Sequence, residues 1–194
     1  MFNTVKLIED RYLDAVIKNL PSKKIIYKYE TGCGATHLEL FISKRHSIVI
    51  EPYIPVILGK SNEDVFAVYG DVTSEDIVDY LSISRKHYKL VSTPEGLKKI
   101  KDACDDLEIN MYKKFFLLVD ECEKLIQDVD FRDGIIDVMD DFFLFNKSSF
   151  ISATPIPPTD PRFTQHGFED FDIYLLRIRK YLLMFTLQII WHQQ

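Results

Sequence analysis

Short apolar segments that alternate with helical patterns constrain the fold of this chain more than any other feature. Six of them are rich in β-branched and aromatic residues, and they lie at 24–29, 46–51, 65–69, 88–92, 115–120 and 149–152. Helical patterns lie between them: the clearest spans 94–107, and another begins at a capping sequence that starts with Thr73. Strands that are apolar on both faces and alternate with helices are typical of a mostly parallel sheet flanked by helices. The sequence therefore predicts an α/β, three-layer fold that binds ligands at the carboxyl ends of its strands.

The length of 194 residues suits one large domain with a single sheet. A hydrophobic fraction of 46% with 28% charged residues argues against extended disorder. The proline-rich stretch 154–167 predicts a surface loop, so we place the main domain at 1–167. We interpret 168–194 as an extra strand near 171–178 and an apolar C-terminal tail. The tail fits a docking segment for a missing partner or an abnormal terminus, such as a truncated linker to a missing second domain, better than it fits an interfacial helix.

Three features bear on the compartment. The apolar tail segment 181–191 is far shorter than the roughly 20 residues of a membrane-spanning helix. The first residues are charged throughout and lack the apolar run of a secretory signal. Cys33, Cys104 and Cys122 form neither a CxxC pair nor an even-numbered disulfide framework. We therefore expect a cytoplasmic protein with reduced thiols and no membrane partner.

The charge balance limits nucleic-acid binding to local contacts. A net charge of -6 excludes a uniformly basic surface of the kind that small dedicated nucleic-acid binders present. The small basic clusters are Lys98, Lys99 and Lys101, and the pair Lys113 and Lys114. Each of them also fits an ordinary solvated face.

A glycine-rich loop follows the first predicted strand and precedes a predicted helix at 37–42. Its residues are Thr31, Gly32, Cys33, Gly34, Ala35 and Thr36. Glycines let backbone amides approach a phosphate, and the Thr36 hydroxyl suits magnesium. Ala35, however, stands where a phosphate loop has the lysine that holds the β- and γ-phosphates. Taken alone, the sequence TGCGAT also fits an ordinary strand-to-helix turn.

An acidic segment ends the predicted strand at 115–120. Asp120 and Glu121 follow the apolar run FFLLV directly. In a nucleotide site Asp120 would hold magnesium, and Glu121 would orient and polarise the attacking water. Taken alone, the segment also fits a solvated helix N-terminus that favours acidic residues.

Five segments in order carry a resemblance to a known family. TGCGAT at 31–36, VDECE at 119–123 and SATP at 152–155 resemble motifs I, II and III of superfamily 2 helicases of the DEAD/DEAH type. VIEP at 49–52 and VSTPEG at 91–96 resemble the weaker motifs Ia and Ib. The resemblance covers roughly 20–160 and corresponds to the first RecA-like domain of these helicases.

The resemblance implies a RecA-like P-loop NTPase fold in which the motif III strand lies between the strands of motifs I and II. It implies ATP and Mg²⁺ as cofactors and single-stranded nucleic acid as a partner. The residues implied to contact the strand, or to couple it to the nucleotide, are Glu51, Pro52, Thr93, Pro94, Ser152, Ala153 and Thr154.

Two absences weigh against a complete motor. Ala35 replaces the lysine of Walker A, and the 168–194 segment is too short for the second RecA-like domain that supplies arginine fingers. We therefore expect a helicase-like nucleotide-binding domain that acts on nucleic acid, in a replication or mobile-element context, with impaired ATP hydrolysis. A second RecA-like domain or another protein would be its partner. A catalytically inactive helicase-fold scaffold or protein-interaction module remains open, as does an unrelated α/β binding protein.

Two other metal patterns fail on spacing. Asp128, Asp130, Asp133 and Gly134 resemble the start of an EF-hand loop, but the glycine is displaced by one position and Met139 replaces the final glutamate. The five histidines show no paired metal-ligand spacing. The sequence therefore predicts neither a calcium nor a zinc site.

Overall fold

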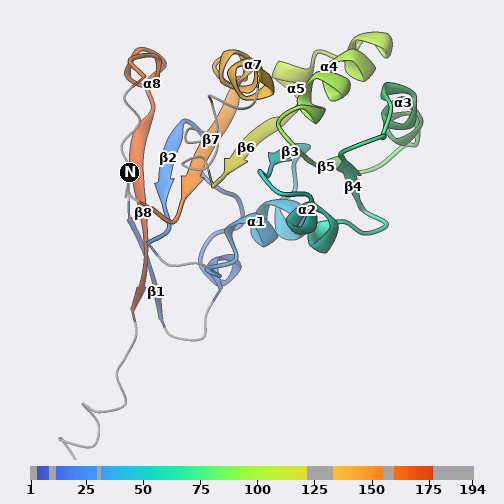
Figure 1. Cartoon of the computed structure of the whole chain (residues 1–194). Coiled ribbons are helices and arrows are strands. Elements are labelled where there is room, and N and C mark those ends of the chain that lie inside the picture. The colour runs from blue at the N-terminus through green and yellow to red at the C-terminus, as the bar shows by residue number, and fades with distance from the viewer. Residues whose placement is uncertain (1–3, 9–11, 30–31, 122–132, 155–159, 177–194) are drawn as a thin grey trace, which may run out of the picture.

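The computed structural model describes residues 4–8, 12–29, 32–121, 133–154 and 160–176 (Figure 1). The strands of these residues form one eight-stranded sheet in the order β1-β8-β2-β7-β6-β3-β5-β4, and every pairing is parallel. Their bounds are β1 (Thr4–Ile8), β2 (Lys24–Tyr27), β3 (Ser47–Ile50), β4 (Val65–Val68), β5 (Lys89–Ser92), β6 (Phe116–Asp120), β7 (Lys147–Ser152) and β8 (Glu169–Leu176). The predicted α/β fold with a parallel sheet is confirmed.

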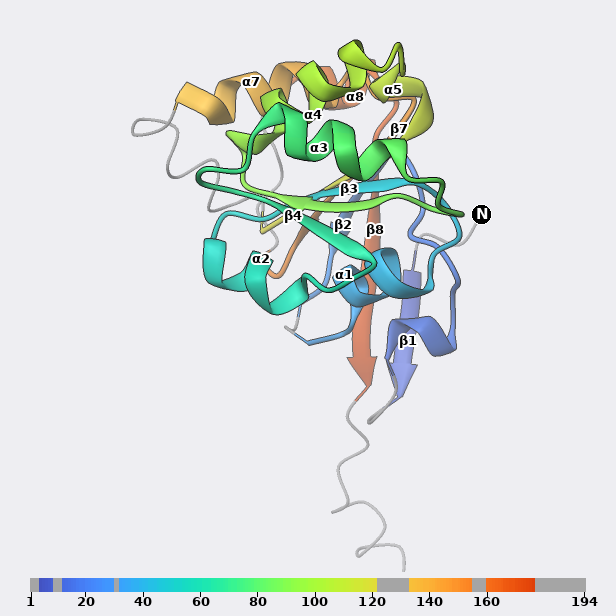
Figure 2. The same cartoon turned by 90° about the vertical axis from the view of Figure 1, so that its right-hand side faces the viewer.

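Helices cover both faces of this sheet (Figure 2). One face carries α3 (Ser74–Ser82), α4 (Gly96–Asp106), α5 (Met111–Lys114), α7 (Asp133–Phe142) and α8 (Arg162–Gln165). The other face carries η1 (Leu13–Ala15), α1 (Ala35–His37), the π-helical turn η2 (Leu38–Ile42) and α2 (Ile54–Lys60). This three-layer arrangement is compatible with a RecA-like fold.

Two apolar cores, one on each face, follow from the two-residue repeat of the strands. Ile25 and Tyr27 of β2 belong to the core that also holds Ile100 of α4. Ile26, between them, belongs to the opposite core together with Leu38 of η2. Each central strand is therefore buried on both faces, which is why the strands are recognisable as continuous apolar runs.

Both predicted helices are present, and the start of the first agrees with the sequence prediction. The Thr73 side chain accepts a hydrogen bond from the Asp76 amide at 3.2 Å, and the Asp76 carboxylate accepts one from the Thr73 amide at 2.8 Å, so α3 begins with a capping box. In the helix predicted at 94–107, α4 begins at Gly96. A Cβ at Gly96 would lie 3.0 Å from the carbonyl oxygen of Val68 and would collide with the Ser92 hydroxyl, so glycine allows the helix to start against the sheet.

The strand order agrees with one specific prediction. β7 pairs with β2 on one side and with β6 on the other, so the strand that ends in SATP lies between the strand of the glycine-rich loop and the strand that ends in Asp120. Parallel strands end at the same edge of a sheet, which we call the carboxyl edge. All three predicted motifs therefore meet there.

Beyond the six strands of the alternating pattern, the sheet contains the extra strand predicted near 171–178, which is β8. β8 pairs with both β2 and β1, so the single sheet continues past residue 167. The edge strand β1 was not predicted, since Lys6 interrupts its short apolar run. Within the described segments, no helix has the length and apolar character needed to cross a membrane. The tail segment 181–191 and Cys122 lie outside those segments, while Cys33 and Cys104 are buried free thiols.

Candidate functional site

A cavity of about 290 Å³ lies at the carboxyl edge of the central strands. Residues 32–37 form one wall, and the other walls include Lys28, Glu51, Lys60, Asp120 and Glu121. Lys28 and Glu51 directly follow β2 and β3, Asp120 ends β6 with Glu121 after it, and Lys60 ends α2. The register of β3 and β6 sets Ile50 beside Val119, so Glu51 and Asp120 come next on neighbouring strands. The sheet thus assembles a polar site from distant parts of the chain.

The glycine-rich loop has an unusual backbone conformation that its glycines permit. Gly32 and Gly34 have φ angles of 80° and 81°, in the left-handed region that other residues rarely adopt. Gly34 is also crowded, because an added Cβ would lie 3.3 Å from Cδ1 of Tyr12. The next residue, Ala35, is 3% exposed and packs in the apolar core with Leu38. Thr31, also predicted to bind the cofactor, lies outside the described residues.

Thr36 and Asp120 meet in the floor of the cavity. The Thr36 hydroxyl donates a hydrogen bond of 2.5 Å to Oδ2 of Asp120. Asp120 is 2% exposed, so its carboxylate is held within the protein and not in solvent. The structure therefore brings together the two residues that the sequence predicts as magnesium ligands.

A lysine that the sequence analysis did not select forms an ion pair with the same carboxylate. Nζ of Lys28 lies 2.7 Å from Oδ1 of Asp120. The amide of Lys28 donates to the carbonyl oxygen of Ser152 at 2.8 Å, which fixes the residue beside the end of β7. Lys28 was included in the predicted strand 24–29 and was therefore not considered as a site residue. A charged side chain at the carboxyl end of a buried strand is the signal that would have identified it.

Lys60 is a second cation that the sequence analysis missed. Its Nζ forms an ion pair with Glu51 and lies 3.8 Å from Oδ2 of Asp120. Glu51, predicted to contact nucleic acid, is 1% exposed and forms part of the cavity wall. The site therefore contains two ammonium groups although the phosphate loop itself has none.

The two acids of this site have opposite pKa shifts. Burial and the nearby charge of Asp120 raise the pKa of Glu51 to about 7, although Lys60 opposes the change. Burial also acts to raise the pKa of Asp120, but the charges of Lys28 and Lys60 and the hydrogen bonds from Lys28 and Thr36 outweigh it and hold that pKa below its usual range. Asp120 is therefore ionised at neutral pH, whereas Glu51 titrates there.

Glu121 lines the cavity in a conformation that is uncommon for glutamate. Its φ angle is 52°, and its amide donates to Oδ1 of Asp120 at 2.9 Å. Non-glycine residues in the left-handed region carry strain of order 1 kcal/mol or more, and such residues cluster at functional sites. The strained turn sets the side chain that the sequence predicts as catalytic directly after the proposed metal ligand.

The remaining predicted residues lie along the carboxyl edge but outside this cavity. The Ser152 hydroxyl accepts from the Thr154 amide at 2.9 Å and donates to its carbonyl oxygen at 2.7 Å, which closes a tight turn around Ala153. Thr93 is buried, and its amide donates to the carbonyl oxygen of Val68 at 3.1 Å. Pro52 follows Glu51 in the loop before α2.

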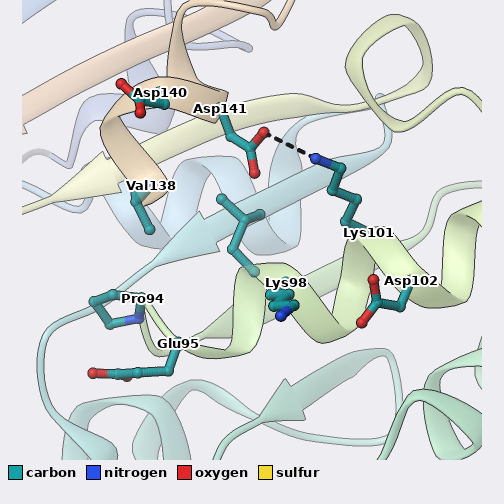
Figure 3. Close-up of a pocket in the computed structure, with 9 residues that line it drawn as sticks. Pro94, Glu95, Lys98, Lys101, Asp102, Val138, Asp140 and Asp141 are labelled. Atoms are coloured by element: carbon teal, nitrogen blue, oxygen red, sulfur yellow. Dashed lines mark hydrogen bonds and ion pairs between the residues drawn. The ribbon is translucent and has the colours of Figure 1, made fainter. Parts of the chain in front are cut away.

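Pro94 lines a different cavity, of about 550 Å³, between α4 and α7 (Figure 3). Its charged residues are Glu95, Lys98, Lys101, Asp102, Asp140 and Asp141. Lys101 lies 3.5 Å from Asp141, which also accepts a hydrogen bond of 2.6 Å from the Tyr112 hydroxyl. Carboxylates outnumber ammonium groups on these walls, so this cavity does not favour a phosphate backbone.

The donor chemistry of the carboxyl edge fits magnesium, which prefers oxygen ligands and binds to one or two carboxylates together with substrate phosphates. Thr36 and Asp120 supply such oxygens side by side. Among the described residues, no group of three or more histidine, cysteine, aspartate or glutamate side chains could hold a metal ion by itself. A metal at this edge would therefore depend on ligand oxygens as well as on the protein.

Comparisons with known proteins add no assignment. A scan against protein-family models found no match, and a search of curated proteins found none either.

Proposed function

We propose that the chain is a helicase-like domain that binds a magnesium nucleoside triphosphate at the carboxyl-edge cavity and acts together with nucleic acid. One observation carries the proposal. The Thr36 hydroxyl and the Asp120 carboxylate, which are 84 positions apart in the chain, lie 2.5 Å apart beneath a loop that contains two left-handed glycines. This combination suits a metal and a phosphate group better than it suits an ordinary strand-to-helix turn.

In this proposal each residue of the site has a defined task. The left-handed glycines keep the loop backbone close to the phosphates, and Thr36 and Asp120 would hold Mg²⁺. The metal would neutralise charge on the phosphate oxygens. Lys28 keeps Asp120 ionised, and Glu121 orients a water molecule toward the terminal phosphate.

Hydrolysis is expected to be slow for two reasons. Ala35 provides no ammonium group at the position where a phosphate loop has one. An arginine finger raises the rate about 10³–10⁵-fold, and in the proposal it would come from a second RecA-like domain or from another partner protein. The domain would therefore bind nucleotide more readily than it hydrolyses it.

A scaffold without nucleotide is the second candidate, and one observation favours it. Both oxygens of Asp120 already have partners within the chain, namely Lys28 and Thr36. A polar cluster that satisfies itself needs no ligand. In this case the α/β fold would serve as a protein-interaction module, and the acidic walls of the α4–α7 cavity would account for the absence of a nucleic-acid surface there.

Calorimetric titration with magnesium-ATP distinguishes the two candidates. The natural chain is expected to bind with micromolar affinity, and Asp120→Asn is expected to abolish binding. Asp105→Asn, which changes an exposed acid on α4, serves as the matched control. Ala35→Lys is expected to bind more tightly, because it restores the ammonium group of the loop. Since position 35 is buried, this variant must first be shown to keep the native unfolding transition. If neither the natural chain nor a folded Ala35→Lys variant binds, the nucleotide-binding proposal fails and the scaffold is the remaining candidate.

A further inference from the structure

Lys28 is the most deeply placed cation of the carboxyl-edge cavity. It is 9% exposed, and its ammonium group reaches across the end of β7 from β2 to the Asp120 carboxylate on β6. Burying an isolated charge is unfavourable, and replacing such a pair by apolar residues is often neutral or stabilising. The pairing with Asp120 alone is therefore weak evidence that Lys28 serves only to stabilise the fold.

The position of Lys28 relative to the proposed metal ligands is specific. Its Nζ lies 2.7 Å from Oδ1 of Asp120, and the Thr36 hydroxyl lies 2.5 Å from Oδ2 of the same carboxylate. A phosphate bound next to Thr36 and Asp120 would be within reach of this ammonium group, because a lysine stem has four flexible carbons. Ala35, by contrast, points its methyl group into the apolar core with Leu38.

We infer that Lys28 supplies the phosphate-binding ammonium group that position 35 lacks, so that the cavity takes the phosphates of a nucleoside triphosphate. The inference rests on the proposed function and deepens it. In the free protein Lys28 is paired with Asp120; in the bound protein it exchanges the carboxylate for a phosphate oxygen. The ammonium group would thus come from the residue that directly follows β2 and not from the glycine-rich loop.

Lys60 is the secondary cation in this arrangement. It lies 3.8 Å from Oδ2 of Asp120 but is also paired with Glu51. Since Glu51 keeps Lys60 engaged, its contribution to phosphate binding is smaller. The volume of about 290 Å³ lies at the lower end of the usual range for small-molecule sites, which suits a phosphate chain better than a whole nucleotide.

Lys24, at the other end of β2, offers a control. It begins β2, is 8% exposed and forms an ion pair with Glu169. Its residue type and burial therefore resemble those of Lys28, but its partner Glu169 is exposed and it lies at the opposite edge of the sheet. A change at Lys24 tests the effect of removing a buried lysine on folding without touching the cavity.

The experiment is a calorimetric titration of magnesium-ATP and of magnesium tripolyphosphate into the natural chain, Lys28→Met, Lys60→Met and Lys24→Met. We expect Lys28→Met to weaken binding about 10- to 100-fold, as for a lost hydrogen bond to a charged group. Lys60→Met should weaken it about threefold, and Lys24→Met less than twofold. Because Lys28→Met leaves Asp120 unpaired, Lys28→Gln, whose amide still donates to Asp120, and Lys28→Arg, which keeps the charge, accompany it.

The outcomes separate this inference from the proposed function. Tight binding by the natural chain and by Lys28→Arg, with a loss in both folded Lys28→Met and folded Lys28→Gln, supports the role of Lys28. Equal binding by the natural chain and by Lys28→Gln overturns that role and leaves the nucleotide site standing. If the natural chain binds neither ligand, the proposed function fails and the inference fails with it.

Discussion

Two clusters of buried charge lie at opposite edges of the same sheet. The carboxyl-edge cluster consists of Lys28, Thr36, Glu51, Lys60 and Asp120, and it opens into a cavity. The amino-edge cluster consists of Glu39, Arg45, Ser47 and Lys89. Both contain buried acids that are paired with cations, so the types of charged group alone do not distinguish the two clusters.

The amino-edge cluster is filled by its own side chains. Glu39 is 0% exposed and accepts two hydrogen bonds from Arg45, of 2.9 and 2.5 Å, and one of 2.5 Å from Ser47. Arg45 also lies over the ring of Phe116, 3.4 Å from its centroid. Lys89 donates to the carbonyl oxygen of Glu39 at 2.6 Å. These contacts attach η2 to β3, β5 and β6.

The difference teaches that buried charge indicates a ligand site only when space adjoins it. At the amino edge every oxygen of Glu39 has a protein donor, and burial and the neighbouring Arg45 lower the pKa of Lys89 to about 8 despite the attraction of Glu39. At the carboxyl edge the same kinds of groups face about 290 Å³ of space. The first arrangement stabilises the fold, and the second is available to a ligand.

The largest expected effect concerns the amino-edge cluster. Glu39→Gln should lower the free energy of unfolding by about 3–5 kcal/mol, because it leaves the buried Lys89 and the half-buried Arg45 without a counter-charge. Urea unfolding measures the change, with Glu63→Gln at an exposed position as the control. A loss below about 1 kcal/mol would mean that the amino-edge cluster is not structural, and the comparison would not hold.

A smaller effect, which depends on pH, is expected for Glu51. Its pKa is about 7 in the folded chain against an ordinary value of 4.5, so its contribution to stability is complete below pH 4.5 and is lost as the pH rises through 7. The natural chain should therefore lose stability relative to Glu51→Gln across this range, by up to about 3 kcal/mol. Unfolding midpoints of both chains from pH 4.5 to 8 measure the difference. Parallel pH profiles would show that Glu51 titrates normally.

Asp120→Asn should change stability less than Glu39→Gln does, by about 1–2 kcal/mol. Water in the cavity can solvate the Lys28 and Lys60 ammonium groups once their counter-charge is removed, which limits the penalty of leaving them unpaired. The same urea titration compares the two variants directly. If Asp120→Asn proved as destabilising as Glu39→Gln, the carboxyl-edge cluster would be structural as well, and the nucleotide site would lose its main support.

The smallest effect is expected at the loop glycines. Gly32→Ala and Gly34→Ala should each lower the unfolding free energy by about 1 kcal/mol, since both φ angles are left-handed. Gly34→Ala should lower it further, because its Cβ would contact Tyr12, whereas nothing lies within 4 Å at Gly32. Thermal unfolding of the two variants isolates that contact. Equal losses would show that Tyr12 moves aside without penalty.

Local sequence patterns predicted the framework well. Apolar runs mark β2 to β7, and those of the central strands are buried on both faces, so that no polar alternation obscures them. The capping sequence at Thr73 marks the start of α3 through contacts within four residues. β1 was not predicted, because Lys6 interrupts the apolar run of this short strand. β1 lies at the edge of the sheet and pairs with β8 on one side only.

The sequence alone determined the α/β class, the succession of strands and the meeting of Thr36 with Asp120 that the motif order implies. Only the tertiary structure decided that Lys28 and Lys60 lie beside Asp120, and that Glu51 forms part of the wall of the same cavity. The physical reason is distance along the chain. Periodicity and capping act between near neighbours, whereas the Lys28–Asp120 pair joins residues 92 positions apart and leaves no periodic signal in the sequence.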